Sequence, residues 1–588
     1  MKRSEINNKF KWKIEDIFAC EDDCYLSLEE IKKELDFSMF KGNLNTAINI
    51  KNCFDKLYNV LAKLEVCSVY AMMKHDEDGS LSSSVKLVGA VDSVEVEFST
   101  QTSFINPELT SLPLEFLKEL SNDVLLVDYK KDIQQIIEYK PHVLGDEAEM
   151  VLALGGKIYG GFKKIFSLID DVDLDYPTIK VDNKKIKVTG ATYSLLLQNK
   201  DREVRKKAFK SYYKAYNKVL NTITAVYQSN LDKNVFFTKV RKFSSCLDRA
   251  LFGEEVDKSV YLNLIKSVHV ALPILHRYIK DRKEILAGEL NMYDLYVPLV
   301  EDAELNLDYE EAFKLVKEGL KPLGENYLKL LDTAYNDGWI DVYENEGKRS
   351  GAYSVCVYNL KHPYVLLNHT KTTHSVFTIA HELGHAIHSY KSNNAQPITT
   401  ADYRIFVAEV ASTVNEILLI KHLIKTSKDS KTKKYFLSYY LDTIRTTLFR
   451  QTMFAEFEQI AHEKAEKGEG ISKEEFNSIY LKLNKKYYGK SVKSNKEISY
   501  EWARIPHFYS AFYVYKYATG IISAIAIAER ILQGEENAVE DYFNFLSSGS
   551  KDKPVELLKL AGVDLNDIET YKKAFNSFES ALIEFENL

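Results

Sequence analysis

The sequence predicts a mainly α-helical protein with one small β-sheet. Only 11 prolines and 24 glycines interrupt the 588 residues, so long helices can form. Apolar residues recur at three- and four-residue spacing over most of the chain, for example at 54–74. Residues 338–370 differ, because glycines and charges separate three short β-like runs near 339–343, 352–358 and 363–368. We therefore expect a helical fold with its sheet in this segment.

The pattern along the chain suggests three successive stretches. Residues 1–110 form an N-terminal helical region that ends near the break "NPELTSLP". Residues 111–200 form a helical segment with a small hairpin at 177–190, where alternating residues flank Asp182 and Asn183. Residues 201–588 hold the remaining helices and the sheet. We predict this last stretch to be one domain.

Charge and composition narrow the class of protein. The formal net charge of −7 offers no basic surface, so nucleic acid is not an expected partner. No stretch approaches the roughly 18 apolar residues of a membrane span, and the first residues lack the apolar core of a signal peptide. Six scattered cysteines suit free thiols. We expect a protein of the reducing cytoplasm with no membrane partner, and the oligomeric state stays unknown.

The motif "HELGH" at 381–385 carries the clearest chemical signal. Within a helix predicted at about 375–391, His381 and His385 lie four residues apart on one face and can bind one metal ion. This composition gives roughly 0.04 chance matches to such a motif, although two hydrogen-bonded core histidines are the alternative. Zinc suits neutral imidazole and keeps one position open in catalytic sites. We predict one Zn²⁺ per chain, with Glu382 activating the metal-bound water as general base.

Two histidines leave the metal short of one protein ligand. His388 lies on nearly the same face, but three ligands in a row on a convex helix rarely converge, so it is assigned a supporting or substrate-contacting role. Glu409 and Glu416, seven residues apart, interrupt an apolar helix at 403–421 and lie on one stripe. Buried carboxylates are costly unless paired or metal-bound. We predict Glu409 as third ligand and Glu416 as partner of a ligating histidine, with two salt-bridged glutamates as the alternative.

Several stretches together resemble the oligoendopeptidase F family, which is related to thimet oligopeptidase and neurolysin. The likeness rests on "HELGHAIHSY", on the gap of 24 residues from His385 to Glu409, and on "FVAEVASTVNE". It extends to "GKRSGAYS" (347–354), "HPYVLLN" (362–368) and "RIPHFYSAFYVYKYATG" (504–520). It covers most of the chain from about 110 to 585. One departure is Ser350, where the family often has glycine.

The resemblance implies a gluzincin-type helical metallopeptidase with a deep substrate channel between two helical halves and the small sheet beside the zinc helix. Residues 111–200 would then form part of the channel wall, and 201–588 the catalytic zincin domain. Members cleave internal bonds of short peptides and spare folded proteins. His381, His385 and Glu409 match the family's zinc ligands and Glu382 its general base. His507 matches its transition-state histidine.

Tyrosines after His507 could complete the catalytic group. Amide hydrolysis builds an oxyanion that needs donors besides the metal, and a tyrosine hydroxyl can supply one. Tyr513 and Tyr517 are four residues apart and share a helix face, while Tyr509 lies one turn earlier on the same stripe. We predict catalytic roles for these three, against the alternative of an aromatic core stripe in a chain with 38 tyrosines.

The segment 347–368 suggests how a substrate would be held. An exposed strand edge near the metal can pair with an extended peptide, and Gly351 would let that backbone approach closely. Tyr353 follows in the same family-like stretch and is a second candidate contact. We therefore expect short peptides as the partners of this chain.

Two other functions stay open at this stage. One is a zinc exopeptidase, carboxypeptidase-like or aminopeptidase-like, in which a cation such as Arg349 or Arg504 would bind a peptide terminus. The other is a non-catalytic zinc-containing peptide-binding protein, although structural zinc usually has four protein ligands. The favoured prediction is a zinc metalloendopeptidase.

Overall fold

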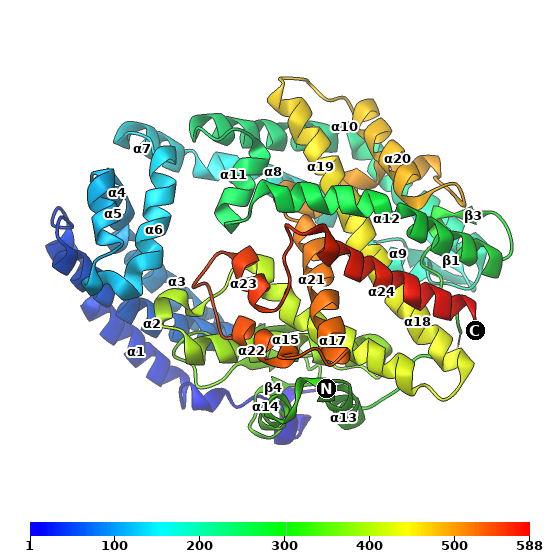
Figure 1. Ribbon diagram of the computed structural model, residues 1–588, viewed down its shortest axis with the longest axis horizontal. Coiled ribbons are helices and arrows are strands. Elements are labelled where there is room, and N and C mark those ends of the chain that lie inside the picture. Colours follow the sequence, from blue (N-terminus) through cyan, green and yellow to red (C-terminus); the bar gives the residue numbers. More distant parts are fainter. Residues whose placement is uncertain (302) are drawn as a thin grey trace. The chain divides into compact units, whose positions relative to one another are not determined.

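The chain forms two compact units, and each combines three separate stretches of sequence. The computed structural model describes residues 1–301 and 303–588. Unit 1 comprises Met1–Val143, Glu304–Leu423 and Ala526–Val563. Unit 2 comprises Leu144–Ala303, Ile424–Ile525 and Asp564–Leu588. Figure 1 shows that helices dominate both units.

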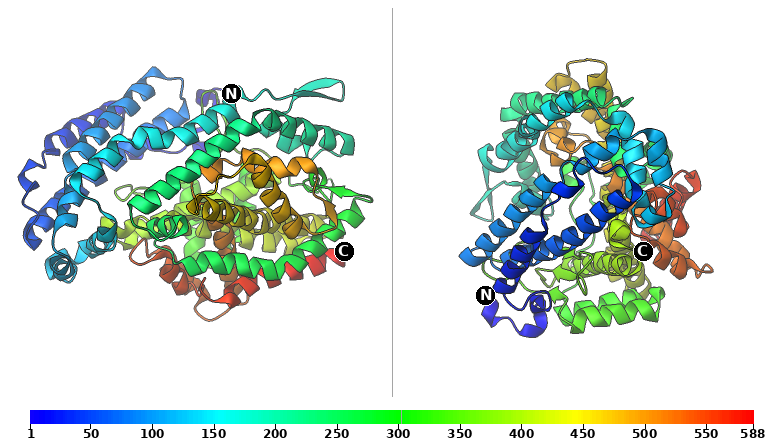
Figure 2. Two further views of the ribbon diagram at one scale, coloured as in Figure 1. Left: turned by 90° about the horizontal axis from the view of Figure 1, so that it is seen from above. Right: turned by 90° about the vertical axis from the view of Figure 1, so that its left-hand side faces the viewer.

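Unit 1 is built mainly from helices and holds one three-stranded sheet. Its helices are α1 (Glu21–Glu34), α2 (Ala47–Glu77), α3 (Ser82–Thr102), α4 (Ile105–Ser111), α5 (Leu114–Leu120), α6 (Lys130–Tyr139), α13 (Tyr309–Gly319), α14 (Glu325–Asn336), α15 (Thr373–Ala395), α16 (Ile398–Ala401), α22 (Ala538–Leu546) and α23 (Pro554–Leu560). Helix α17 (Ile405–Thr426) lies in this unit up to Leu423. Helices α1, α2 and α3 pack side by side and form its N-terminal layer (Figure 2).

The sheet of unit 1 has the strand order β4-β6-β5. Strand β6 (Tyr364–Leu366) pairs in parallel with β4 (Ile340–Asp341) and antiparallel with β5 (Tyr353–Val355). Strand β5 is therefore an edge strand. Leu366 and Tyr364 join the apolar core that Trp12 and the helices α1 to α6 form, and this core fixes the sheet against the N-terminal layer. Both β5 and β6 contact α15.

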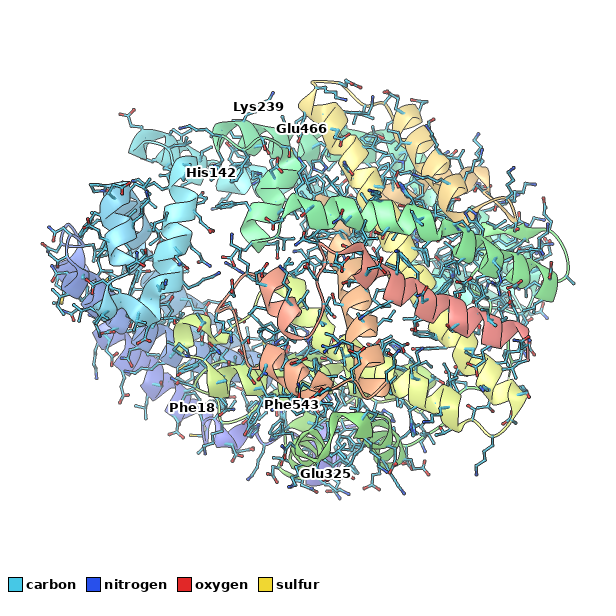
Figure 3. The ribbon with its side chains drawn as sticks, viewed as in Figure 1. Phe18, His142, Lys239, Glu325, Glu466 and Phe543 are labelled. Atoms are coloured by element: carbon cyan, nitrogen blue, oxygen red, sulfur yellow. The ribbon has the colours of Figure 1, made fainter. Side chains whose placement is uncertain are left out.

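Unit 2 surrounds one long helix. Its helices are α7 (Asp146–Leu154), α8 (Gly156–Leu168), α9 (Gly190–Leu196), α10 (Arg202–Val240), α11 (Cys246–Glu254), α12 (Lys258–Ile285), α18 (Ser430–Ile444), α19 (Arg450–Glu466), α20 (Lys473–Tyr488) and α24 (Ile568–Glu586), with α21 (Tyr515–Leu532) up to Ile525. Helix α10 contacts α8, α9 and α19, and α12 runs beside α24 (Figure 1). Glu466, labelled in Figure 3, accepts a hydrogen bond from the backbone N–H of Cys246 and so joins α19 to the start of α11.

Two short sheets complete unit 2. Strands β1 (Thr178–Val181) and β2 (Lys184–Lys187) form a hairpin, and β3 (Leu290–Asn291) pairs in parallel with β7 (Val492–Lys493). The hairpin turn places Asp182 and Asn183 at φ of 46° and 63°, the left-handed region that a two-residue hairpin turn needs. Asn and Asp tolerate this region better than other non-glycine residues. The predicted hairpin is therefore confirmed.

The predicted fold class is confirmed. The structure is mainly helical and has a small sheet beside the helix that carries "HELGH", with strands inside all three predicted β-like runs. The stretch boundaries near 110 and 200 and the substrate channel stay predictions. Among the described residues, no helix combines the length and apolar character needed to cross a membrane. All six cysteines are free thiols.

Candidate active site

Helix α15 presents the "HELGH" motif from a largely buried position. The Thr372 side chain caps its start by accepting a hydrogen bond from the Ser375 backbone N–H at 3.3 Å. Most apolar residues from Val376 to Ile387 are buried, which fixes the rotation of the helix. The faces that remain carry His381 and His385, each only partly exposed.

Helix α17 approaches α15 closely enough to bring a carboxylate to these histidines. A Cβ built on Gly384 would lie 2.5 Å from Ser412 Cα and 2.8 Å from the Ala411 carbonyl oxygen, so only glycine allows this separation. The buried Asn415 side chain donates to the Ala380 carbonyl at 2.9 Å and locks the two helices in register. Its oxygen accepts from the Tyr327 hydroxyl at 2.9 Å.

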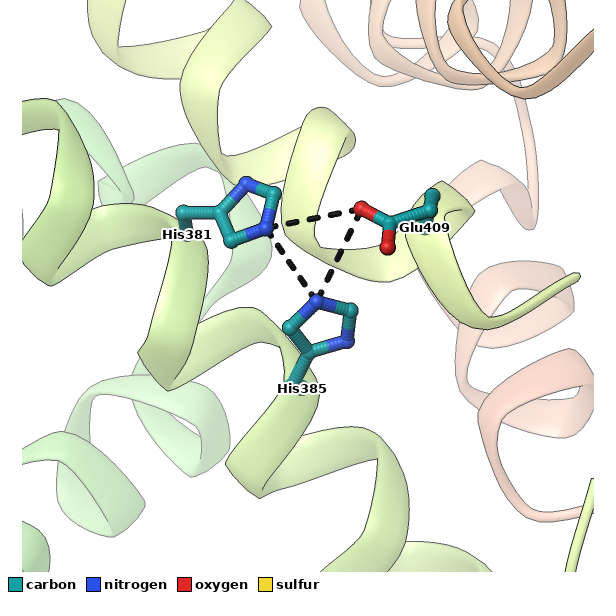
Figure 4. Close-up of side chains that lie close together, drawn as sticks. All are labelled: His381, His385 and Glu409. Atoms are coloured by element: carbon teal, nitrogen blue, oxygen red, sulfur yellow. Dashed lines mark hydrogen bonds and ion pairs between the residues drawn. The ribbon is translucent and has the colours of Figure 1, made fainter. Parts of the chain in front are cut away.

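Three side chains from α15 and α17 converge on one point (Figure 4). His381 Nε2 lies 3.2 Å from His385 Nε2 and 3.4 Å from Glu409 Oε2. His385 Nε2 lies 3.8 Å from the same Glu409 oxygen, and the three atoms lie within 4.8 Å of one another. The sequence-predicted ligand set is thus brought together in space.

The donor set suits a divalent metal ion. Two ligands of a tetrahedral zinc at about 2.0–2.1 Å from the ion lie roughly 3.3–3.4 Å apart, close to the separations found here. Two imidazole nitrogens and a carboxylate oxygen face one point, and each can give a lone pair to a cation there once His381 Nε2 has lost its proton. Imidazole and carboxylate are typical ligands of catalytic zinc. The residues therefore fit a metal ion held by His381, His385 and Glu409.

Neighbouring carboxylates control the protons of this group. Burial disfavours charge on His381, but the hydrogen bond between its Nδ1 and Glu416, with the charges of Glu382 and Glu409, raises its pKa to about 9. Burial and the charge of His381 lower the pKa of His385 to about 3. His381 therefore holds a second ring proton much more strongly than His385 does. A metal ion would displace the proton on His381 Nε2, because a ring nitrogen binds metal only when it is deprotonated.

Glu416 and Glu382 occupy different places around the group. Glu416 accepts a hydrogen bond from His381 Nδ1, which leaves Nε2 free to face the other ligand atoms. Glu382 is buried within α15, and burial raises its pKa to about 7; the charge of His381 opposes this shift, and Glu409 and Glu416 add to it. A carboxyl group with a pKa near 7 can both accept and return a proton at neutral pH.

The sequence of this chain matches a known enzyme family over most of its length. The profile of Peptidase family M3 matches residues 195–577, and that of Oligopeptidase F matches residues 108–176. The chain belongs to peptidase family M3. The members of this family are metallopeptidases, so the convergent histidines and glutamate lie in an enzyme of a metal-dependent class.

Relatives of this M3 peptidase carry consistent names. Oligopeptidase PepF of Bacillus subtilis is 38% identical over 592 residues, which span 100% of this chain and 88% of that protein. The crystal structure of oligoendopeptidase-F from Enterococcus faecium, 34% identical, superposes with a TM-score of 0.74 over 96% of this chain and 98% of that chain. A Chlamydophila abortus structure named as a peptidase, also 34% identical, reaches 0.94 over 100% and 99%. The predicted resemblance to oligoendopeptidase F is confirmed, as is the prediction of an enzyme.

His388 does not join the metal-binding group of this M3 peptidase. Its ring is buried and stacks on Tyr403 with centroids 3.7 Å apart and an interplanar angle of 7°. Within the described part of the chain, its Nδ1 atom has no hydrogen-bond partner. Burial lowers the pKa of His388 to about 3, so the ring is neutral. Its predicted supporting role stays a prediction.

His507, in unit 2, contacts two of the three predicted tyrosines. Its Nε2 atom is 3.2 Å from the Tyr517 hydroxyl oxygen, and its ring stacks against that of Tyr513 with centroids 5.8 Å apart. The Tyr513 and Tyr517 rings are 5.6 Å apart. Burial, assisted by the charge of Lys163, lowers the pKa of His507. These three side chains form one polar aromatic group.

Tyr509 is separate from that group, because the predicted helix through 509, 513 and 517 does not form. A 3-10 turn spans Pro506–Tyr509, and α21 begins only at Tyr515. Between them Phe512 adopts φ of 54°, which breaks the helical path. The Tyr509 ring is buried and stacks on Phe166 with centroids 4.4 Å apart.

The edge strand β5 lies in the segment where the sequence predicts that a peptide backbone binds. Gly351 has φ of 88° and open space where a side chain would be, just before the strand. The Tyr353 hydroxyl donates to Asp76 at 2.8 Å, so this ring is anchored to α2. A cavity of about 240 Å³ lies between this segment and the start of α15, and Gly351, Asn368, His374 and Thr378 are among the residues that line it.

Asn415 is a site-supporting residue that the sequence argument did not single out. It lies in the same apolar helix as Glu409 and Glu416 and is fully buried. A buried amide needs partners, and here these are the backbone of α15 and a tyrosine of α14. The signal was present in "FVAEVASTVNE", where Asn415 directly precedes Glu416.

Proposed function

We propose that this M3 peptidase is a zinc-dependent endopeptidase that hydrolyses internal bonds of short, unfolded oligopeptides in the cytoplasm. The observation that carries the proposal is the convergence of His381, His385 and Glu409, with Glu382 on the same helix. Free thiols at all six cysteines suit a reducing compartment. The names of the relatives, oligopeptidase and oligoendopeptidase, support the substrate class.

In this proposal the protein residues hold the metal ion and move the protons. A zinc ion bound by His381, His385 and Glu409 would supply a Lewis acid that polarises a water molecule and the scissile carbonyl. Glu382 takes the proton of the attacking water and returns it to the leaving amine. Its pKa, raised to about 7 by burial, suits both transfers. Glu416 orients His381 by its hydrogen bond to Nδ1.

His507 and its neighbouring tyrosines would supply hydrogen-bond donors for the oxyanion. His507 and the hydroxyl groups of Tyr513 and Tyr517 belong to one group of side chains. A donor aimed at developing negative charge lowers the barrier of acyl transfer. We assign this role to His507 and to one of these two tyrosines. Tyr509 is the weaker candidate because its ring is buried against Phe166.

Substrate binding would use the edge strand. An extended peptide could add to the outer edge of β5, which pairs with no other strand among the described residues; such main-chain hydrogen bonds read the backbone of a peptide rather than its side chains. Gly351 leaves room for that backbone, and the neighbouring cavity can take a side chain. Only an unfolded segment can pair in this way, which supports short peptides as substrates.

The variant Glu382→Gln tests the proposal. It keeps the size of the side chain and removes its ability to take a proton, so we expect retained zinc and a fall in kcat of about 10²–10⁴-fold. Metal content by mass spectrometry and hydrolysis of a quenched peptide measure both. Glu325→Gln, at an exposed position at the start of α14, is the matched control and should behave as wild type. Near-normal turnover of Glu382→Gln would contradict the assignment.

A peptide blocked at both ends distinguishes an endopeptidase from an exopeptidase. An exopeptidase needs a free terminus, so it would leave this peptide intact. We expect cleavage at an internal bond, identified by mass spectrometry of the products, and loss of cleavage when a chelator removes the metal.

A further inference from the structure

Unit 2 contains a cavity of about 350 Å³ that His507 borders. Its walls come from α9, α10, α19, α20 and the 3-10 segment Lys496–Arg504. Arg450, Arg504 and Glu501 are the charged side chains among the residues that line it, and four tyrosines, Tyr193, Tyr213, Tyr296 and Tyr488, line it as well. The cavity is therefore lined by ionised groups as well as by tyrosines.

The three charged side chains leave an excess of positive charge. Arg450 Nη2 and Arg504 Nη2 both donate to the same oxygen, Glu501 Oε1, at 2.6 Å. The Tyr480 hydroxyl donates to the other oxygen. Burial alone would raise the pKa of Glu501, but the two guanidinium groups lower it to about 2, so it is ionised. One carboxylate thus faces two guanidinium groups. Both of its oxygens already accept hydrogen bonds, one from the two arginines and the other from Tyr480.

Both arginines retain donors that the protein does not use. A guanidinium group has five N–H donors. Across residues 1–301 and 303–588, the protein accepts one hydrogen bond from Arg450, through Nη2, and two from Arg504, through Nη2 and Nε. The Arg450 and Arg504 side chains are 15% and 21% exposed, whereas Glu501 is 4% exposed. All three side chains line the cavity, and the two arginines are more exposed than the carboxylate that they share.

In the part of the chain that the structure describes, other charged groups near the cavity are not ion-paired with its two arginines. The charge of Asp170 acts on Arg504, but among the described residues no ion pair joins the two, and Asp170 accepts a hydrogen bond from the Tyr216 hydroxyl. Behind Tyr296, the Arg445 guanidinium lies 5.1 Å from the ring centroid. Arg445 and Arg282 in turn share the single carboxylate of Asp442. A second pair of arginines that shares one acidic partner therefore lies next to Tyr296, a residue of the cavity lining.

We propose that this cavity binds a carboxylate group of the peptide substrate on Arg450 and Arg504. Planar guanidinium groups bind carboxylates through paired hydrogen bonds, and a buried excess charge is stabilised by an anionic ligand. The inference rests on the proposed function, because it takes a peptide as the ligand and His507 as a residue that meets the reacting bond. Arg504 precedes His507 by three residues, at most about 11 Å of backbone. A carboxylate bound there would therefore lie within a few peptide residues of the bond that His507 meets.

The carboxylate can come from the C-terminus of the peptide or from an Asp or Glu side chain. Matched quenched peptides distinguish these sources: one sequence with a free C-terminal acid, the same sequence as an amide, and amides carrying Glu or Gln at successive positions. We expect kcat/KM to be at least about tenfold higher for the peptide with the carboxylate. A difference of about tenfold corresponds to one hydrogen bond between charged groups. If Glu at one fixed position raises kcat/KM of the amide peptide to that of the acid, the carboxylate comes from a side chain.

Variants connect this preference to the cavity. Arg450→Gln should reduce the acid-to-amide ratio, which is kcat/KM for the acid divided by kcat/KM for the amide, to a value between about 1 and about 3. Arg450→Lys should restore part of this ratio because the positive charge returns. Arg277→Gln, which removes an exposed arginine of unit 2 paired with Glu586, is the matched control and should leave the ratio unchanged. A wild-type ratio near one for every carboxylate position, or a ratio that Arg450→Gln and Arg277→Gln affect equally, would overturn the inference.

Binding experiments separate this inference from the proposed function and do not depend on the folding of Arg450→Gln. Calorimetry on Glu382→Gln compares the affinities of one peptide as acid and as amide. Tighter binding of the acid by about tenfold supports the carboxylate site even if no peptide is hydrolysed, in which case the proposed function fails alone. Equal affinities, together with normal hydrolysis by wild type, overturn the carboxylate site and leave the proposed function standing.

Discussion

At the scale of single residues, Glu416 shows how a side chain that would not touch the metal can govern the site. Its carboxylate accepts a hydrogen bond from His381 Nδ1, so the opposite nitrogen faces His385 and Glu409. The spacing of Glu409 and Glu416 in an apolar helix was enough to predict that both lie on one stripe. The same pattern led us to predict Glu409 as ligand and Glu416 as partner of a histidine, the family resemblance implied the same ligand, and the distances agree with that choice.

We predict that Glu416→Gln weakens zinc binding by about 10–100-fold, because the ring of His381 loses its charged partner. Competition with a metal-binding dye measures the affinity. Glu382→Gln, which keeps all three ligands and Glu416, serves as the control and should bind zinc nearly as well as wild type. An unchanged affinity in Glu416→Gln would show that the hydrogen bond does not orient the ligand.

Glu458 is a second residue whose role follows from its surroundings. It is fully buried in α19, and its Oε1 accepts a hydrogen bond from the Phe512 backbone N–H at 2.9 Å. Phe512 is the residue with φ of 54° that separates His507 from α21. Burial raises the pKa of Glu458 from 4.5 to about 8, and the Phe512 N–H opposes this shift. The neutral carboxyl group therefore holds the turn below about pH 8.

We predict that Glu458→Gln changes the pH dependence of stability. Since the folded pKa lies above the unfolded value, Glu458 contributes its full stability below pH 4.5, and this contribution falls as the pH rises from 4.5 to about 8. Glutamine does not titrate, so the Tm of the variant relative to wild type should increase across that range. Thermal unfolding at pH 5 and pH 9 measures it. A constant difference in Tm would contradict a raised pKa.

At the scale of elements, the closeness of α15 and α17 decides whether three ligand atoms can meet. Gly384 lies against Ser412 and Ala411, so the contact contains no side chain from α15. Helical periodicity predicted both helices and their buried faces. The separation between them could not be predicted from periodicity, because it depends on which residues of two distant segments meet.

We predict that Gly384→Ala destabilises the protein by about 1–3 kcal/mol through overpacking and reduces zinc affinity, because α17 and Glu409 must move away from the histidines. Gly89→Ala in α3 is the matched control, since nothing lies within 4 Å of its added Cβ and alanine favours the helix by about 0.5–1 kcal/mol. Chemical denaturation and metal titration measure both variants. Equal behaviour of the two would show that the helices are free to separate.

The turn between His507 and α21 marks the limit of the sequence argument. The spacing of tyrosines at 509, 513 and 517 is that of one helix face, yet a 3-10 turn and the positive φ of Phe512 replace the first part of that helix. The hydrogen bond that stabilises this conformation comes from Glu458, 54 positions earlier in the chain. A local pattern cannot reveal such a distant partner, so Tyr509 was grouped with tyrosines from which it is separated.

At the scale of the whole molecule, the predicted metal ligands and general base all belong to unit 1, and His507 with its tyrosines belongs to unit 2. Each unit combines three stretches that are far apart in sequence. Periodicity along the chain therefore predicted helices in order but could not assign them to units. Because all predicted metal ligands belong to unit 1, we expect removal of the metal to destabilise unit 1 more than unit 2.

We predict that removing the metal abolishes peptide hydrolysis, that Zn²⁺ restores it, and that the loss of stability is concentrated in unit 1. An ion present at about 1,000 times its Kd stabilises the form that binds it by about 4 kcal/mol. Hydrogen–deuterium exchange should therefore be faster with chelator than without it in α15 and in α17 up to Leu423, whereas α12 and α24 in unit 2 should keep their protection.

Helices α1 and α2 are the control within unit 1, since they carry no ligand, and their exchange should change less than that of α15. A rise of equal size in α12, α24 and α15 would contradict a site confined to unit 1, and unchanged exchange in α15 would contradict metal binding by His381 and His385.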